Sequence, residues 1–229
     1  MTIGIIMAAG KGIRAKTDLP KQFCKICDKP VLSYSLSTFE KSTLVDSCLV
    51  MIPDGWKDNT LQITREFSKV RWILTGGTTR HETSLIAIDF LKTINPSIVI
   101  FHDAARPFLS LNLLEKVIQE AKIYGAATAA ISVSDTVAYS KNGFIDSYIP
   151  RESLYRIQTP QAFEYRIIAD AIRKSQAEDG TKPVFLSNRK IRIVEGDPYC
   201  FKITKPEDLD LAQSICKFWE DTKCSQKQP

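Results

Sequence analysis

The feature that most constrains the fold of this chain is a regular alternation of short apolar runs with longer amphipathic ones. The apolar runs are rich in β-branched residues and predict strands at Ile3–Met7, Ser47–Ile52, Val70–Leu74, Ile98–His102 and Ala126–Val133. The amphipathic runs predict helices at Pro30–Lys41, Asp58–Phe67, Glu82–Ile94, Leu111–Tyr124, Tyr165–Glu178 and Pro206–Trp219. Fully apolar strands that alternate with helices indicate an α/β fold: a Rossmann-like, mostly parallel sheet with helices on both faces.

Two local signals refine this outline. The stretch from Ser134 to Phe163 breaks the alternation, and Asn142-Gly143 lies there between two short alternating runs, a strong hairpin signal. We therefore predict one domain over residues 1–229 with an inserted β-arm at about residues 134–160. Before the last helix, Thr204 is the predicted N-cap, with Glu207 three residues further on as in a capping box.

Composition excludes several classes of protein. The length of 229 residues suits a single α/β domain, and the net charge of +5 comes without a dense Lys/Arg stripe, which argues against nucleic acid as a partner. No apolar run approaches the ~20 residues of a membrane helix, and no signal peptide is evident, so we expect a cytoplasmic protein without a membrane partner. Cys24 and Cys27 form a C-x-x-C without a second pair or neighbouring histidines, and we interpret them as free thiols.

A glycine loop follows the first strand, and "GKGIRA" at residues 10–15 matches the dinucleotide pattern G-x-G-x-x-G/A. A dehydrogenase is therefore an alternative, but Asp18-Leu19-Pro20 breaks the helix that should follow at once. The acidic ribose ligand expected ~20 residues further on is also missing. A Walker loop does not fit either, because no G-K-[ST] follows the glycines.

The interpretation that remains is a loop whose backbone amides wrap a triphosphate while Arg14 and Lys21 neutralise it. Such cations would stabilise charge that develops at the α-phosphate and on the leaving pyrophosphate. From this loop alone, an ordinary turn with surface cations stays open as the alternative.

A second constellation, "HDAARPF", follows the strand that ends near His102. Ligands of open α/β sheets bind at the carboxyl ends of the strands. A lone carboxylate there suits Mg²⁺, which takes few protein ligands together with phosphate oxygens and water. Asp103 is therefore the predicted metal ligand, and a turn or helix cap is its alternative role.

Five segments together resemble the CTP-dependent cytidylyltransferases that act on 2-C-methyl-D-erythritol 4-phosphate or ribitol 5-phosphate. They are "AAGKGIR…LPKQF", "GGTTRHETS", "HDAARPF", "SDTVAY…IPRESLYRIQTPQAF" and "EGDPYCFKITKPEDLDLA". They cover most of the chain in the family's order and spacing. The resemblance implies a nucleotidyltransferase fold of the glycosyltransferase-A type, CTP as a substrate, a divalent cation such as Mg²⁺, and a homodimer formed through the β-arm.

The resemblance also implies roles for particular residues. The positions that match nucleotide-binding residues of the family are Ala8, Ala9, Gly10, Gly12, Gly77, Arg80, Thr83 and Asp103. Those that match residues on the acceptor side are Arg106, Asp135, Thr136, Arg151 and Thr181. The cations implied around the reacting phosphates are Arg14, Lys21, Arg151 and Lys202. Because the attacking phosphate oxygen is already an anion, this in-line reaction needs no general base, and neither histidine nor any cysteine stands out as one.

The chain departs from the family pattern on the acceptor side. Relatives carry Thr-Asp-acidic-Ala-Ser before the "VEG" strand, whereas here Lys182 follows Thr181 and Pro183 argues against a normal helix. Cys200 stands where relatives commonly have Asn. We expect 2-C-methyl-D-erythritol 4-phosphate as the acceptor, with ribitol 5-phosphate as the alternative. Another nucleotide-sugar pyrophosphorylase, or a catalytically altered relative that only binds nucleotide, is the further alternative.

Overall fold

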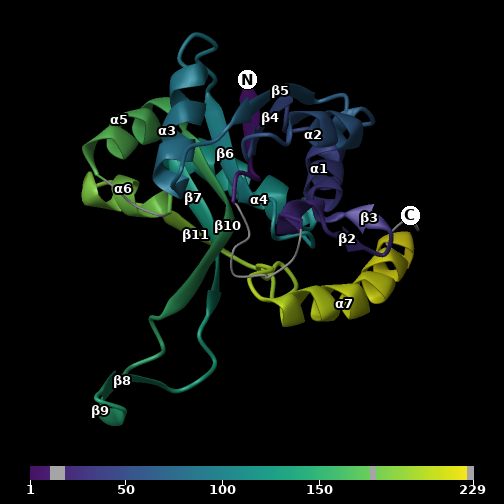
Figure 1. Cartoon of the computed structure of the whole chain (residues 1–229). Helices are drawn as coiled ribbons and strands as arrows, with labels where there is room; N and C mark the ends of the chain where they lie inside the picture. The colour runs from purple at the N-terminus through teal and green to yellow at the C-terminus, as the bar shows by residue number, and fades with distance from the viewer. Residues whose placement is uncertain (11–18, 176–178, 226–229) are drawn as a thin grey trace.

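The computed structural model describes residues 1–10, 19–175 and 179–225, with side chains to residue 219. Its core is a seven-stranded sheet of order β11-β7-β10-β6-β1-β4-β5 (Figure 1). The strands are β1 (Thr2–Met7), β4 (Ser47–Ile52), β5 (Val70–Thr75), β6 (Ile98–Asp103), β7 (Ala126–Ser132), β10 (Tyr155–Glu164) and β11 (Arg192–Glu195). All neighbouring strands are parallel except β10, which is antiparallel to both β6 and β7. The predicted mostly parallel sheet is confirmed.

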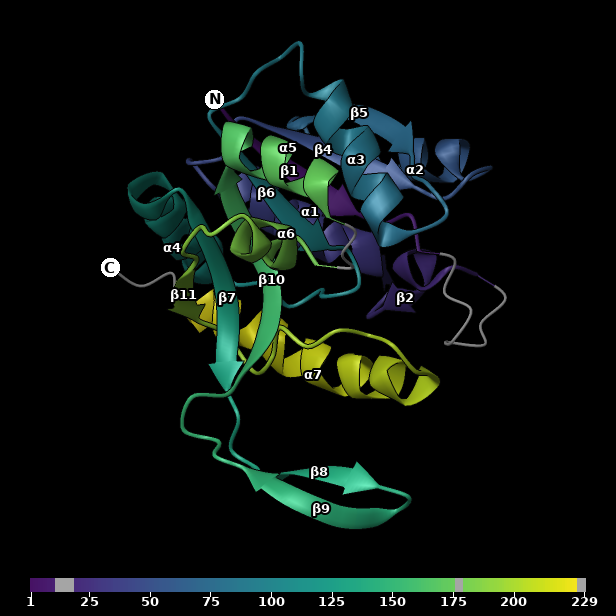
Figure 2. The ribbon, with the colours of Figure 1, turned by 90° about the vertical axis from the view of Figure 1, so that its left-hand side faces the viewer.

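Helices cover both faces of this sheet, as Figure 2 shows. One face packs against α1 (Val31–Lys41), α2 (Lys57–Thr64) and α4 (Leu111–Tyr124). The other packs against α3 (Arg80–Phe90), α5 (Tyr165–Lys174) and the short α6 (Thr181–Leu186). Successive side chains of a strand point to opposite faces, so Ile5 of β1 joins one apolar core and Ile6 joins the other.

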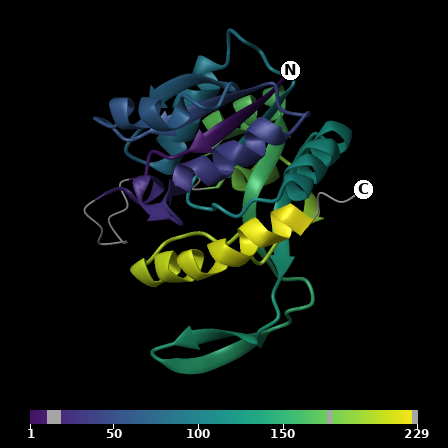
Figure 3. The same cartoon turned by 90° about the vertical axis from the view of Figure 1, so that its right-hand side faces the viewer.

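A third, smaller apolar cluster lies beside the sheet. It holds the long helix α7 (Pro206–Ser225) against α1 and the short hairpin of β2 (Lys25–Ile26) and β3 (Lys29–Pro30). A single turn of 3-10 helix, η2 (Lys21–Phe23), precedes that hairpin. Figure 3 shows α7 running across the molecule below the helices that cover the sheet. This packing brings the segment before α7 next to the η2 turn, where Lys21 bonds to the Ile203 carbonyl.

Several predicted elements match the structure residue for residue or nearly so. Ser47–Ile52 and Leu111–Tyr124 have the predicted bounds. The helix predicted from Glu82 begins at Arg80, because Thr79 and Glu82 form a capping box there. The Asn142-Gly143 turn joins β8 (Val137–Lys141) to β9 (Phe144–Ile149), and both turn residues have the positive φ that this turn requires.

The predicted arm was too long at its C-terminal end. Tyr155–Glu164 forms β10 and belongs to the main sheet, so only the hairpin of β8 and β9 with its irregular connecting segments projects from the body (Figures 1 and 2). Periodicity of apolar residues does not distinguish a strand in a projecting hairpin from one that returns to the sheet. The neighbours that decide this, β6 and β7, are far away in the sequence.

Two further predictions about helix ends were wrong. Thr204 is not the N-cap of α7, which begins at Pro206. The Asp208 carboxylate instead accepts hydrogen bonds from the backbone N–H groups of Thr204 and Lys205, at 2.7 and 2.8 Å. Pro183 does not prevent a helix either, because it lies in the first turn of α6, where a backbone N–H has no intrahelical partner to lose. Within the described residues, no helix is long and apolar enough to cross a membrane.

Candidate functional site

The candidate site lies where the chain reverses direction across the sheet. From β1 the chain moves to β4 and β5 on one side, and β6 lies on the other side of β1. Such a switch point leaves a crevice at the carboxyl ends of the strands. The loop Ala8–Gly10 follows β1 at this edge, and Asp103 is the last residue of β6, paired in register with Met7.

Asp103 is the centre of a cluster of charges. Its Oδ1 lies 2.7 Å from the Arg80 guanidinium, and its Oδ2 lies 2.9 Å from Lys202 Nζ and 3.6 Å from Arg106 Nε. The three cations come from the first turn of α3, the loop after β6 and the segment before α7. Sequence reasoning selected all four residues separately, and the structure brings them together.

This cluster carries an excess of positive charge. Three cations surround one carboxylate, whose side chain is only 8% exposed. Burial opposes ionisation of Asp103, but Arg80, Lys202 and Arg106 outweigh that effect and hold its pKa well below the usual range. The carboxylate therefore remains charged and keeps the cations in place, and the surplus charge attracts a polyanion.

Lys21 joins this group from the other end of the chain. It begins the η2 turn, and its Nζ donates a 2.8 Å hydrogen bond to the carbonyl of Ile203, next to Lys202. Lys21 therefore contacts the segment that carries Lys202, although 181 positions separate the two lysines in the sequence. Of the other residues predicted in this loop, Gly12 and Arg14 lie outside the described residues.

The start of the glycine loop is held by Gln22, a residue that sequence reasoning did not select. Its side chain is 2% exposed, and Nε2 donates to the carbonyls of Ala8 at 2.5 Å and Gly10 at 3.1 Å. A side-chain amide that binds both carbonyls fixes the orientation of the peptides between them. Its position beside Lys21 in "LPKQF" was the available signal.

The second glycine loop is shaped by protein atoms. A Cβ on Gly76 would come within 2.4 Å of Ala9 Cβ, and a Cβ on Gly77 within 2.4 Å of Glu82 Cβ. The predicted nucleotide contact Thr83 is 3% exposed, and its hydroxyl accepts from Gly77 N–H and donates to the Thr79 carbonyl. These glycines thus allow the two loops and α3 to approach one another, and Thr83 lies beneath the loop that it supports.

On the acceptor side, Thr181 is the first residue of α6. Its N–H donates to the Asp179 carboxylate at 2.7 Å, and its hydroxyl also bonds to that carboxylate. The other oxygen of Asp179 accepts from Gln161 Nε2 at 2.5 Å, and Gln161 is fully buried. An acidic side chain thus contacts Thr181 from two positions before it, at Asp179.

The arm residues lie apart from this cluster within one chain. Asp135, Thr136 and Arg151 are exposed at the base of the arm, where an Arg151 guanidinium nitrogen donates to the Ser134 carbonyl at 2.5 Å. Figures 1 and 2 show the arm extending away from the sheet. A single chain therefore does not bring these three residues to Asp103.

Two buried groups that could have served as a base or nucleophile are unsuited to either role. Burial lowers the pKa of His102 to about 4, and both ring nitrogens are hydrogen bonded inside the protein. Burial raises the pKa of the Cys200 thiol to about 12, so it stays protonated and donates to the Thr159 carbonyl. Cys200 thus has a packing role in the position where relatives commonly have Asn.

The chemistry of the site fits a divalent cation that arrives with a polyphosphate. Among the described residues, no three His, Cys, Asp or Glu side chains are grouped as metal ligands. Asp103 is a single carboxylate, and both of its oxygens already face cations. Mg²⁺ commonly takes one or two carboxylates and completes its shell with phosphate oxygens and water, so an ion at Asp103 would depend on a bound polyphosphate for most of its ligands.

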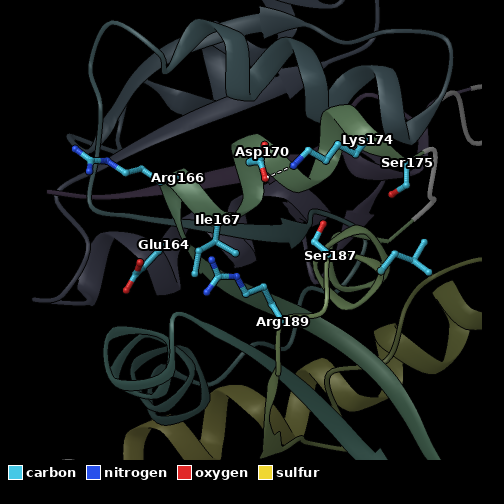
Figure 4. Close-up of a pocket in the computed structure, with 9 residues that line it drawn as sticks. Glu164, Arg166, Ile167, Asp170, Lys174, Ser175, Ser187 and Arg189 are labelled. Atoms are coloured by element: carbon cyan, nitrogen blue, oxygen red, sulfur yellow. Dashed lines mark hydrogen bonds and ion pairs between the residues drawn. The ribbon is translucent and has the colours of Figure 1, made fainter.

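A separate pocket of about 490 Å³ lies between α5 and α6 (Figure 4). It contains charges of both signs, including the Lys174–Asp170 ion pair drawn there, together with Glu164 and Arg189. None of the predicted site residues lines it. Its mixed charge distinguishes it from the positive cluster around Asp103.

A mostly parallel sheet, a glycine loop at its switch point and a cluster of cations beside it define an α/β nucleotidyltransferase. The family model for 2-C-methyl-D-erythritol 4-phosphate cytidylyltransferase matches residues 2–217. The chain belongs to this family of CTP-dependent cytidylyltransferases, which confirms the resemblance found in the sequence motifs.

Individual relatives agree with this assignment. The chain is 40% identical over 222 residues to the protein of that name from Thermotoga neapolitana, an alignment that covers 96% of this chain and 99% of the relative. It is 36% identical over 221 residues to that of Thermosipho africanus, covering 92% and 96%. The crystal structure of 4-diphosphocytidyl-2C-methyl-D-erythritol synthase from Anaerococcus prevotii superposes with a TM-score of 0.83 at 26% identity, covering 94% and 96% of the two chains.

Proposed function

We propose that the protein transfers CMP from CTP to 2-C-methyl-D-erythritol 4-phosphate and releases pyrophosphate, a step of isoprenoid precursor synthesis. The observation that carries this proposal is the cluster of Arg80, Arg106 and Lys202 around Asp103, beside the glycine loop of a chain of this family. Relatives at 34–40% identity, including the two described above, carry the same acceptor in their names.

The reaction is an in-line attack by a phosphate oxygen of the acceptor on the α-phosphorus of CTP. A bond forms between that oxygen and phosphorus, the bond to the β-phosphate oxygen breaks, and pyrophosphate leaves with the electron pair. Reactions of this kind require positioning and charge stabilisation from the protein. Lys21 and Lys202 supply fixed positive charge where the α-phosphate and the leaving group become more negative. We propose that Arg14 acts with these lysines, because it matches a cation of the family motif.

Asp103 has two roles in this proposal. It orients Arg80, Arg106 and Lys202, and it is the carboxylate that would hold a Mg²⁺ ion brought in with CTP. When bound, the ion would neutralise phosphate charge. Because the site has a positive surplus without nucleotide, we expect the metal and the triphosphate to bind together.

The acceptor is proposed to lie on the side of Arg106 and Thr181, with Asp135, Thr136 and Arg151 supplied by the arm of a second subunit. An isolated two-stranded hairpin is marginally stable in water. The arm nevertheless exposes Phe144 and Tyr148, which are 78% and 67% accessible. A homodimer that covers these side chains and completes each acceptor site would explain both the exposed aromatic residues and the stability of the hairpin. Because CTP and polyol phosphates are intracellular metabolites, the proposal also places the enzyme in the cytoplasm.

The test is pyrophosphate release with CTP and Mg²⁺, with 2-C-methyl-D-erythritol 4-phosphate and ribitol 5-phosphate offered in parallel. Turnover with the erythritol phosphate, and at least ~10²-fold less with ribitol phosphate, supports the proposed acceptor. The opposite preference would identify the alternative substrate. Binding of CTP without turnover on either acceptor would identify a relative that has lost catalysis, and ATP, GTP and UTP in place of CTP test the nucleobase.

A further inference from the structure

A closed ring of hydrogen bonds lies directly behind the charged cluster. It begins at His102, the residue before Asp103 in β6, whose side chain is fully buried and packs near the ring of Phe39. His102 Nε2 lies 3.1 Å from the carbonyl oxygen of Arg106, and Nδ1 lies 3.1 Å from the hydroxyl of Thr159. The imidazole therefore connects the loop after β6 to the neighbouring strand β10.

The chemistry of these partners defines the direction of every bond. A carbonyl oxygen can only accept, so Nε2 of His102 carries the proton and donates it to Arg106. In the neutral ring Nδ1 then accepts, and the donor is the Thr159 hydroxyl. The same hydroxyl oxygen accepts the backbone N–H of Asp103 at 3.0 Å. The Nε2–H tautomer of His102 thus gives each of these donors and acceptors a hydrogen-bond partner.

The ring continues to the segment that carries Lys202. The Cys200 thiol donates to the Thr159 carbonyl, and the Cys200 carbonyl accepts from the Arg106 guanidinium at 2.8 Å. The backbone N–H of Arg106 also donates to the carbonyl of Asp103 at 2.9 Å, which closes a turn. The side chains of His102 and Thr159, which are 0% and 2% exposed, therefore join the backbones of Asp103 and Arg106. The side chains of Cys200 and Arg106 join the segment just before Lys202 to them.

We propose that His102 is a positioning residue of the transfer reaction. As the neutral Nε2–H tautomer bonded to Thr159, it fixes the Asp103–Arg106 turn and with it the cations that face the phosphates. Because His102 is fully buried, it touches neither substrate, and it acts through Asp103 and Arg106. The effect is expected in turnover, since a displacement of about 1 Å in a catalytic group can lower the rate by about 10²-fold. The proposal rests on the transfer activity proposed above.

The first test needs no substrate and no assay of activity. The chain has two histidines, His81 and His102, so a long-range ¹H–¹⁵N spectrum of the labelled protein near pH 7 contains two imidazole patterns. His81→Gln identifies the pattern of His102 by removing the other one. We expect a neutral ring protonated at Nε2 alone. A ring protonated at Nδ1, or a mixture of tautomers in exchange, would overturn the proposal whatever the activity of the enzyme.

The second test is a double-mutant cycle measured by pyrophosphate release. Thr159→Val removes the hydroxyl but keeps the shape, and Thr159→Ser keeps the hydroxyl. We expect kcat to fall about 10- to 100-fold in Thr159→Val and His102→Phe, with Thr159→Ser within about threefold of wild type. The double variant His102→Phe/Thr159→Val should be no slower than the slower single variant, because both remove the same connection.

Two outcomes of the cycle would contradict the proposal. Equal losses in Thr159→Val and Thr159→Ser would show that the hydroxyl is not what matters. Losses that multiply in the double variant would show that His102 and Thr159 act separately. Each variant is assayed well below its own melting temperature, so that a smaller folded fraction does not imitate a slower reaction. A wild-type protein without transfer activity would instead refute the proposed function and leave the tautomer result standing.

Discussion

Lys202 Nζ lies 2.9 Å from Oδ2 of Asp103, which joins the segment before the last helix to the end of the central strand β6. The lysine side chain is 38% exposed and the carboxylate 8%, so the pair stands at the boundary between protein and solvent. A buried carboxylate that organises partly exposed cations is suited to a site that must present positive charge in a fixed arrangement.

We expect Asp103→Asn to lower turnover by at least ~10²-fold, since it removes the charge that orients Arg80, Arg106 and Lys202. Asp89→Asn is the matched control, because Asp89 pairs with Arg173 on the surface, where both side chains are well exposed and such pairs contribute little. Steady-state kinetics of the two variants check this. Similar activities in both would show that the cluster does not organise the site.

Lys202, and Lys21, which bonds to the neighbouring Ile203 carbonyl, are expected to act in the transition state. Lys21→Ala and Lys202→Ala should each lower kcat by at least ~10²-fold, the scale of losing one charge contact to the developing anion. Lys174→Ala removes a lysine from the exposed pair with Asp170 and should leave kcat within about twofold. Near-normal turnover in both site variants would exclude the cation cage.

Gln22→Glu is expected to weaken CTP binding by about tenfold. The substitution replaces the Nε2 donor with an oxygen that faces the carbonyls of Ala8 and Gly10, so the start of the glycine loop loses its support. Isothermal titration with CTP and Mg²⁺ measures the change. Gln62→Glu makes the same chemical change on an exposed position of α2 and should bind CTP as wild type does. Equal affinities in the two variants would mean that Gln22 does not shape the loop.

The arm is expected to be required for dimerisation. Phe144→Ser/Tyr148→Ser removes two of its most exposed aromatic side chains and should shift the protein towards monomer in light scattering, with loss of activity. Ile123→Ser alters an equally exposed apolar residue on α4 and should change neither property. A double variant that remains fully dimeric would place the interface elsewhere, and a monomeric wild type would refute the homodimer.

Cysteine reactivity should follow burial. Burial raises the pKa of both the Cys48 and Cys200 thiols to about 12, so little thiolate is available there at pH 8. Cys24 and Cys27 are partly exposed. Peptide mass spectrometry after brief treatment with iodoacetamide should find Cys24 and Cys27 modified, and Cys48 and Cys200 modified only after unfolding. Early modification of Cys200 would show that the ring around Thr159 opens readily.

Elements whose signal is local could be predicted from the sequence. Ser47–Ile52 is apolar from Cys48 onwards, and its burial on both faces of a parallel sheet explains that composition. Asn142-Gly143 predicted the turn of the arm, because these residues tolerate the positive φ that the turn requires. Asp103 could be selected as a site residue because it directly follows an apolar strand, at the end of the sheet where ligands bind.

What only the tertiary structure decided are the contacts between segments that are remote in the chain. β10 was assigned to the arm because its neighbours β6 and β7 are not visible in its own periodicity. Lys21 bonds to a carbonyl 182 positions away, and His102 to a hydroxyl 57 positions away. The sequence by itself determined the alternating elements, the turn and the identities of the charged residues, since these depend on local spacing and side-chain chemistry. The meeting of three cations at Asp103, and the buried ring that holds them, depend on how the sheet and the C-terminal segment pack.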